Sequence, residues 1–255
     1  MTAKKKKKLS KAGRWILDLI LIAALLTAGY SGYRIYSAMH AYQESEQEYT
    51  VIRGEVMNSE IKISDYRHDI NWEKLQAINP DVVGWISMKD STIDYPIVQG
   101  NDNVYYLNHL INGRESNAGT IFIDVNNSDP FNDRNTVLYG HHMLSDPKMF
   151  AELENYENQS YYDTHKTLII ETPDKVYELQ VVAGIKTVGT GGYVRLGFEN
   201  DDAFLNYVYS FTSRSTFTSD VSVAAGDRLI LLSTCSYDQN DGRYALLCRI
   251  NEIEE

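Results

Sequence analysis

Cys235 and Arg243 stand close together near the end of this chain of 255 residues. Cys235 ends the apolar run LLSTC, and Arg243 opens the next apolar run, RYALLCRI. Between them lies a polar stretch whose Asp241-Gly242 pair is a strong turn signal. The pattern predicts a hairpin of two strands that sets Arg243 beside Cys235.

A cysteine attacks a carbonyl as its thiolate, which needs a basic or cationic neighbour. His141 is a candidate neighbour, because with His142 it directly follows the strand-like run NTVLYG and so opens a loop at a strand end. Cys235, His141 and Arg243 can therefore converge at one rim of a barrel. The arginine is always charged and carries several donors, which suits an oxyanion or a substrate carbonyl.

The amino-acid sequence alone also allows other interpretations of these residues. Cys235 can be a buried filler residue, or it can form a disulfide with Cys248, the second cysteine. Cys248 lies within ALLCRI and is typical of a small buried hydrophobe, and its odd separation from Arg243 predicts the opposite strand face. The vicinal histidines lack a third ligand at metal-site spacing, so a zinc site is weakly supported. They can also be loop residues without a role, as Arg243 can be an ordinary surface arginine.

Charge is very unevenly distributed along the chain. Residues 1–34 contain eight Lys or Arg and one Asp, whereas the whole chain has a net charge of −11, which leaves −18 for the remainder. Such an acidic body argues against nucleic acid as a partner.

Residues 1–14 read as a basic cytoplasmic tail, and residues 15–33 as a transmembrane signal-anchor. The 19 residues of this predominantly apolar segment span roughly 28 Å as a helix, close to the thickness of a bilayer core. The positive-inside rule places the N-terminus in the cytoplasm and the rest outside, in a single-pass protein of the cell membrane. A cleaved signal peptide is the alternative.

Residues 34–68 are mainly polar, with a single Gly and no Pro, and they predict an extracellular helical stalk. Residues 69–255 read as one catalytic domain with many closely spaced strands and a few helices, which favours a mostly antiparallel β-barrel. One helix is expected at 201–211, with Phe204, Leu205 and Val208 on one face.

Several segments resemble a known family. LLSTC resembles the T-L-x-T-C signature of sortases, with an arginine opening a strand shortly afterwards, and LYGHHM resembles their histidine motif. INPDVVGWISM, TIDYPIVQGNDNVYYLNH and AGTIFIDVNNSDP are similar to class B sortases, and the helix at 201–211 fits the extra helix of that class. The resemblance extends over roughly residues 70–252, and the order of the segments is more specific than any single motif.

The resemblance implies an eight-stranded sortase β-barrel and a membrane-anchored cysteine transpeptidase of a Gram-positive cell surface, with no cofactor and no metal. Its substrates would be surface proteins with a C-terminal sorting motif, cleaved after Thr through a thioacyl-enzyme. The acceptor would be an amine of the peptidoglycan precursor lipid II. Cys235 would be the nucleophile, His141 the general acid and base, and Arg243 the oxyanion and substrate stabiliser. By the same analogy the substrate pocket would be lined by Tyr139, Asn108, Ser233 and Thr234.

The chain departs from the family pattern at Leu231, where the signature has Thr, and it offers His142 as a competitor for the role of His141. Two other functions remain as alternatives. One is a pilin-polymerising sortase, whose acceptor is a pilin lysine. The other is a non-catalytic, wall-associated binding module in which Cys235 is inert core.

Overall fold

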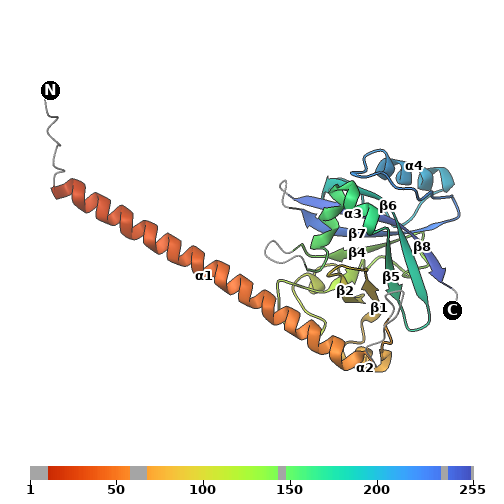
Figure 1. The fold of residues 1–255 in the computed structure, drawn as a ribbon, viewed down its shortest axis with the longest axis horizontal. Coiled ribbons are helices and arrows are strands. Elements are labelled where there is room, and N and C mark those ends of the chain that lie inside the picture. Colours follow the sequence, from red (N-terminus) through yellow and green to blue (C-terminus); the bar gives the residue numbers. More distant parts are fainter. Residues whose placement is uncertain (1–10, 58–67, 143–147, 237–240, 254–255) are drawn as a thin grey trace. The chain divides into compact units, whose positions relative to one another are not determined.

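A computed structural model describes residues 11–57, 68–142, 148–236 and 241–253 of the chain (Figure 1). The chain divides into two compact units, Met1–Gln43 and Glu44–Glu255. Helix α1, Lys11–Val56, begins in the first unit and ends in the second.

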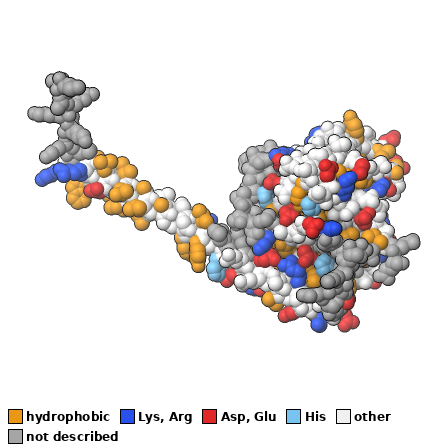
Figure 2. Space-filling view, viewed as in Figure 1, with side chains coloured by type: hydrophobic (Ala, Val, Ile, Leu, Met, Phe, Trp, Pro, Cys, Tyr) orange, Lys and Arg blue, Asp and Glu red, His pale blue; other side chains and the backbone are white. Residues whose placement is uncertain are grey.

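The first unit is dominated by the apolar part of α1. Its segment Gly13–Ser37 is long and apolar enough to cross a membrane, and its most apolar window is entirely unburied. Figure 2 shows hydrophobic side chains gathered along this part of the helix. Trp15, within this segment, is 72% exposed. A helix that exposes such side chains lacks the protein core that would cover them, so this segment is a candidate membrane anchor.

The second unit is a closed eight-stranded barrel, as the sequence predicted. The order of its strands is β1-β2-β3-β4-β7-β8-β6-β5. The β2–β3 and β4–β7 pairs are parallel and the other pairs antiparallel. The strands are β1 (Val82–Ser87), β2 (Asp94–Val98), β3 (Ile121–Ile123), β4 (Asn135–Gly140), β5 (Thr167–Glu171), β6 (Val176–Val188), β7 (Arg228–Ser236) and β8 (Gly242–Ile253). The helices of this unit besides the end of α1 are α2 (Trp72–Ile78), α3 (Gln159–Thr164), α4 (Asp201–Thr212) and the short 3-10 helices η1 (Tyr105–Leu107) and η2 (Ala151–Glu157).

Strand β7 is buried on both faces, which explains its continuous apolar run. Leu229 and Leu231 belong to one apolar cluster with residues of α4, including Phe204. Because side chains alternate along a strand, Ile230 and Leu232 lie on the other face, and both are fully buried. This double burial fixes the strand that carries Cys235 at its end.

Helix α4 packs on the outside of the barrel through residues at helical spacing. Asn200 caps its N-terminus by accepting a hydrogen bond from the backbone N–H of Ala203. Its buried side chains are Phe204, Tyr207, Val208 and Phe211. The expected face was wrong at Leu205, which is 38% exposed. The buried face follows the spacing i, i+3, i+4, i+7 from Phe204, so Leu205, the next residue, lies off this face.

The last turns of α1 belong to the barrel unit. Tyr49, Ile52 and Val56 are each at most 3% exposed, and their spacing forms one apolar stripe along the helix. The sequence placed residues 34–68 in a stalk and began the domain at residue 69, whereas the compact unit begins at Glu44. The stripe is sparse and is flanked by charged residues, so its burial was not evident from the composition of the segment.

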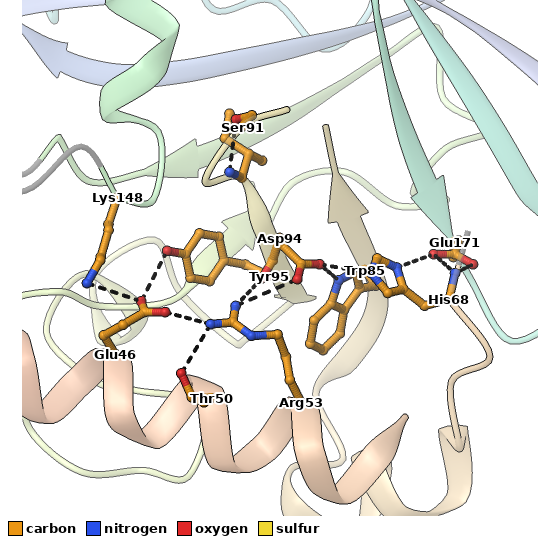
Figure 3. A network of polar contacts seen from close by, with 11 residues as sticks. Glu46, Thr50, Arg53, His68, Trp85, Ser91, Asp94, Tyr95, Lys148 and Glu171 are labelled. Atoms are coloured by element: carbon orange, nitrogen blue, oxygen red, sulfur yellow. Dashed lines mark hydrogen bonds and ion pairs between the residues drawn. The ribbon is translucent and has the colours of Figure 1, made fainter. Parts of the chain in front are cut away.

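A polar network ties α1 to β1, β2 and β5 (Figure 3). Arg53 of α1 donates to the backbone carbonyl of Asp94 at 2.7 Å. The Asp94 carboxylate accepts a hydrogen bond from the Trp85 indole N–H at 2.7 Å and lies 3.3 Å from Nε2 of His68. Nδ1 of His68 lies 3.0 Å from the Glu171 carboxylate. These contacts join the segment before the barrel to three of its strands.

Candidate active site

The register of β4, β7 and β8 brings three predicted residues to one end of the barrel. In the β7–β8 hairpin Cys235 pairs with Arg243. In the parallel β4–β7 pair Gly140 is the partner of Thr234. His141 and Cys235 each follow one residue later, so the residue after β4 and a residue near the end of β7 lie at the same level on adjacent strands. The expected convergence at one rim is therefore present in the backbone.

A cavity of about 260 Å³ opens at this end of the barrel. The described residues that line it are Asn103, Leu107, Phe122, Tyr139, Gly140, His141, Gly189, Tyr193, Val194, Ser233, Thr234 and Arg243. Its walls are mainly apolar and aromatic, with a few polar groups and one guanidinium, a lining suited to an extended peptide with a reacting carbonyl.

His141 is fixed at both its backbone and its ring. Its carbonyl accepts a hydrogen bond from the Phe150 N–H at 3.0 Å, and its Nε2 lies 2.6 Å from the Leu107 carbonyl oxygen. A carbonyl can only accept, so Nε2 carries a proton, and Nδ1 is the nitrogen that can take one up. Burial lowers the pKa of His141 below its ordinary value; the Leu107 bond opposes this, and the Arg243 charge lowers the pKa further.

The loop beneath His141 requires glycine at position 119. Gly119 has φ of +62°, and a Cβ there would lie 3.1 Å from Cδ2 of His141 and 2.5 Å from the Tyr106 carbonyl oxygen. The Gly119 carbonyl accepts a hydrogen bond from the Tyr49 hydroxyl at 2.8 Å. The last part of α1 thus supports the loop that packs against His141.

Arg243 is oriented by the turn that precedes it. Its Nη2 lies 3.0 Å from the Asp241 carboxylate, and its Nη1 donates to the Gly242 carbonyl at 2.8 Å. The turn is anchored to the loop after β6, because the Gly189 N–H donates to the Asp241 carbonyl at 2.9 Å. A Cβ at Gly189 would lie only 2.6 Å from the Asp241 carboxylate. The carboxylate therefore occupies the space that a side chain at Gly189 would need.

The two cysteines differ sharply in their surroundings. Cys248 is a free, fully buried thiol whose pKa is raised by burial, so the predicted filler residue is confirmed and the disulfide with Cys235 is not formed. Cys235 lies in β7 beside Arg243, and its side chain is outside the described part of the structure.

The other predicted pocket residues divide into two groups. Tyr139, Ser233 and Thr234 line the cavity. The Ser233 hydroxyl lies 2.8 Å from that of Tyr193, whereas the buried Thr234 hydroxyl has no hydrogen-bond partner within the described residues. Asn108 is exposed, follows η1 and is not among the described residues that line the cavity, and its role in substrate binding stays a prediction.

The short 3-10 turn of η1 places Leu107 at the cavity instead of Asn108. The lining residues missed by sequence reasoning include Asn103, Phe122, Tyr193 and Val194. Asn103 and Leu107 lie within the quoted segment NDNVYYLNH, which was the available signal. Tyr193 follows several glycines after β6. These glycines predict a loop, but they do not predict that the loop turns toward the cavity.

His142, the competing histidine, faces a different partner. Its Nδ1 lies 3.5 Å from the Glu154 carboxylate of η2, and it is not among the described residues that line the cavity. Within the described ranges no group of three or more His, Cys, Asp or Glu side chains is placed to hold a metal ion.

Comparison with known proteins identifies the family. A sortase-domain model matches residues 86–250. Sortase B of Staphylococcus aureus is 31% identical over 242 residues, covering 93% of this chain and 96% of the relative. The solved structure of the S. aureus sortase B–substrate complex is 32% identical with a TM-score of 0.68, covering 84% of this chain and 94% of the other. A sortase B complexed with triglycine is 31% identical with a TM-score of 0.70, covering 86% of this chain and 99% of the other. Together with the eight-stranded barrel, these similarities show that the chain belongs to the class B sortases, a family of cysteine transpeptidases that anchor surface proteins.

Proposed function

We propose that this sortase cleaves the C-terminal sorting motif of exported surface proteins after a Thr and joins the released acyl group to an amine of the peptidoglycan precursor lipid II. Two relatives support the choice of ligands. One is a sortase B–substrate complex, and the other is a sortase B complexed with triglycine. A peptide substrate and an amine acceptor are therefore the proposed reactants for this chain.

The observation that carries the proposal is the strand register. Cys235 pairs with Arg243 across the β7–β8 hairpin, and His141 emerges beside Cys235 from the neighbouring strand. This register supports the proposal that a nucleophile, a proton carrier and a cation act together at one end of the barrel, the arrangement that acyl transfer requires.

In the first step, the Cys235 thiolate attacks the Thr carbonyl carbon and forms a C–S bond. The carbonyl electron pair moves onto oxygen, and the Arg243 guanidinium stabilises the resulting negative charge. The C–N bond then breaks, and protonated His141 gives its Nδ1 proton to the leaving amine. The product is a thioester between Cys235 and the Thr residue, and His141 is left neutral.

In the second step, the acceptor amine attacks the thioester carbonyl. Neutral His141 takes a proton from the attacking nitrogen, and the C–S bond breaks to restore the thiolate. Burial and the charge of Arg243 lower the pKa of His141, so the neutral form that this step needs is favoured. The same shift makes the protonated form, which the first step needs, a stronger acid toward the leaving amine.

We further propose the topology that the charge pattern predicts. Residues 1–14 are the cytoplasmic tail, residues 15–33 lie within the candidate span Gly13–Ser37, and the barrel is extracellular. Tagged cysteines placed before and after the span should react with a membrane-impermeant probe only on the barrel side. Labelling of the tail in intact cells would contradict this topology.

A panel of quenched peptides that carry different sorting motifs tests the reaction with the full chain in detergent. At least one motif should be cleaved after Thr, added triglycine should appear in the product, and mass spectrometry should detect the thioacyl-enzyme. The Cys235→Ala variant should lose cleavage entirely. Unchanged cleavage in that variant would overturn the proposal, and preferred transfer to a lysine-containing peptide would point to pilin polymerisation.

Cys248→Ala is the matched control. Its thiol is fully buried and has a raised pKa, so its removal should leave the cleavage rate nearly unchanged. A thiol-reactive probe should label native protein at Cys235 and not at Cys248. Labelling of both only after denaturation would favour the inert binding module.

A further inference from the structure

Asp124 is a buried carboxylate just behind the cavity wall. It follows β3, is 4% exposed, and is not among the described residues that line the cavity. The Tyr139 hydroxyl donates to its Oδ2 at 2.9 Å. Tyr139 itself lines the cavity beside His141, so a buried charge acts directly on a residue of the cavity wall.

The orientation of this carboxylate is fixed by other donors. Its Oδ1 accepts two hydrogen bonds from Asn126, from the backbone N–H and from the side-chain amide, each at 2.9 Å. The side chain of Asn103, another lining residue, contributes to the lowered pKa of Asp124, and the Oδ1 of Asn103 accepts from the Val125 N–H at 2.8 Å. Asp124 therefore joins the cavity residue Tyr139 to the end of β3.

This arrangement has a consequence for hydrogen bonding in the cavity. A tyrosine hydroxyl has one proton, and here it is directed to Asp124. The hydroxyl oxygen can then offer only lone pairs to a molecule in the cavity. An ionised carboxylate is acceptor-only, so this direction cannot reverse while Asp124 is charged, and hydrogen bonds hold the pKa of Asp124 below its ordinary value despite its burial.

We propose that Asp124 is a positioning residue that makes Tyr139 a hydrogen-bond acceptor for a backbone N–H of the bound peptide. The inference rests on the proposed function, because the donor is an amide of the peptide that is cleaved. The inference specifies one requirement on the substrate: the backbone nitrogen that faces Tyr139 must carry a hydrogen. A peptide without that hydrogen loses the contact.

Asp124→Asn reverses the direction of this bond without changing the shape of the side chain. The two donors of Asn126 retain the remaining oxygen on their side, so the new amide nitrogen faces Tyr139. The Tyr139 hydroxyl must then accept from this amide and turn its proton toward the cavity, where it opposes the peptide N–H. Tyr139→Phe removes the hydroxyl oxygen, so this position can neither donate a hydrogen bond to the peptide nor accept one from it.

The first measurement is KM and kcat for a cleaved peptide and for a series in which each backbone N–H is replaced in turn by an ester oxygen. In the wild type, one replacement should raise KM by roughly tenfold, the size of one hydrogen bond. That penalty should vanish in Tyr139→Phe. With the ordinary peptide KM should rise in the order wild type, Tyr139→Phe, Asp124→Asn, while kcat changes less. An unchanged KM in Asp124→Asn, or an ester penalty that persists in Tyr139→Phe, would overturn the inference.

Asp220→Asn is the control for charge loss. Asp220 also accepts a hydrogen bond from a tyrosine, Tyr162, at 2.6 Å, but neither residue is among the described residues that line the cavity. This variant should keep the wild-type KM and the wild-type ester penalty. A change equal to that of Asp124→Asn would mean that general destabilisation, rather than positioning, explains the effect.

A second measurement does not depend on cleavage. In protein labelled at the tyrosine Cζ carbon, the NMR signal absent from Tyr139→Phe identifies Tyr139. Burial and the charge of Asp124 raise the pKa of Tyr139, so its signal should titrate at lower pH in Asp124→Asn. An unchanged titration would overturn the inference even if peptides are cleaved. If no peptide is cleaved by the wild type, the proposed function fails, and this titration still tests whether the Asp124 charge acts on the Tyr139 hydroxyl.

Discussion

His141 and His68 are two half-buried histidines in opposite electrostatic surroundings. His141 lies at the cavity, with a backbone carbonyl on one ring nitrogen and the Arg243 charge nearby, and its pKa is lowered by burial and by that charge. His68 lies where α1 meets the barrel, between Asp94 and Glu171 (Figure 3). Burial alone would lower the pKa of His68, but the hydrogen bond and charge of Glu171 and the charge of Asp94 raise it.

The contrast distinguishes a candidate catalytic site, around His141, from a structural contact, around His68, that holds α1 against the barrel. Around His68 both ring nitrogens contact carboxylates, so the charge of the ring is compensated inside the protein. The cavity instead contains a histidine that favours its neutral form and a Thr234 hydroxyl without a partner in the described residues. Groups that lack compensation in the free protein are those a bound ligand can satisfy.

The largest expected effect is on catalysis at His141. His141→Gln should lower kcat/KM for the sorting peptide by about 10³-fold, as expected for loss of a general acid and base. The unfolding midpoint should hardly change, because Gln can still donate to the Leu107 carbonyl. His68→Gln should show the reverse, with near-normal kcat/KM and a lower midpoint. Loss of activity in both variants to the same degree would remove the distinction between the two sites.

Arg243→Lys should have the next largest effect, with kcat lower by about 10²-fold. Lysine keeps the positive charge but lacks the planar guanidinium donors that can bind an oxyanion and the Asp241 carboxylate at the same time. Asp241→Asn should give a smaller loss, because Arg243 keeps its bond to the Gly242 carbonyl. Initial rates with a saturating peptide measure both. An Arg243→Lys variant with wild-type kcat would show that charge alone is sufficient.

The barrel was predictable from sequence because its signals are local. Apolar runs such as LILL, a Pro173-Asp174 turn between β5 and β6, and the Asp241-Gly242 turn before β8 each act within a few residues. The apolar stripe of α1 was missed because a few buried positions among charged ones become visible only when a partner surface is known. Leu205 was misplaced for a similar reason, since one residue along a helix turns the side chain by about 100°.

The cavity was predicted less completely than the strands that carry it. Tyr139, Ser233 and Thr234 were found because they adjoin the histidine and cysteine motifs in sequence. Asp124 was missed although it lies in a quoted segment, because its contact with Tyr139 depends on the pairing of β3 with β4. Such side-chain contacts depend on how the strands pair and on how deeply each side chain is buried. A local sequence pattern predicts neither.

Glu171→Gln tests the cohesive site directly. Glu171 is 5% exposed and accepts from both the backbone N–H and Nδ1 of His68, at 2.9 Å and 3.0 Å. The neutral amide should lower the free energy of unfolding by about 1–3 kcal/mol, because it leaves a charged or strongly polar group without its full partner. Denaturant unfolding of the full chain in detergent measures the change. A stability equal to wild type would show that the network in Figure 3 contributes little.

The smallest effect expected is the difference in titration of the two histidines. NMR titration of the Cys235→Ala variant, which has no thiolate at this position, should give a pKa below 6.5 for His141 and above 6.5 for His68. The consequences for stability have opposite signs. His68 adds stability below its unfolded pKa near 6.5, and this contribution is lost as the pH rises through its folded pKa. His141 costs stability as the pH falls below 6.5, because only the unfolded chain readily takes up the proton.

Arg243→Gln in the same Cys235→Ala background separates the causes of the lowered pKa. Without the guanidinium, the pKa of His141 should rise toward 6.5 but stay below it, since burial is the larger cause. The pKa of His68 should not move, because its raised value depends on Glu171 and Asp94. The variants His141→Gln and His68→Gln assign the two signals among the six histidines of the chain. A pKa of His141 at or above 6.5 would mean that the cavity does not favour the neutral ring.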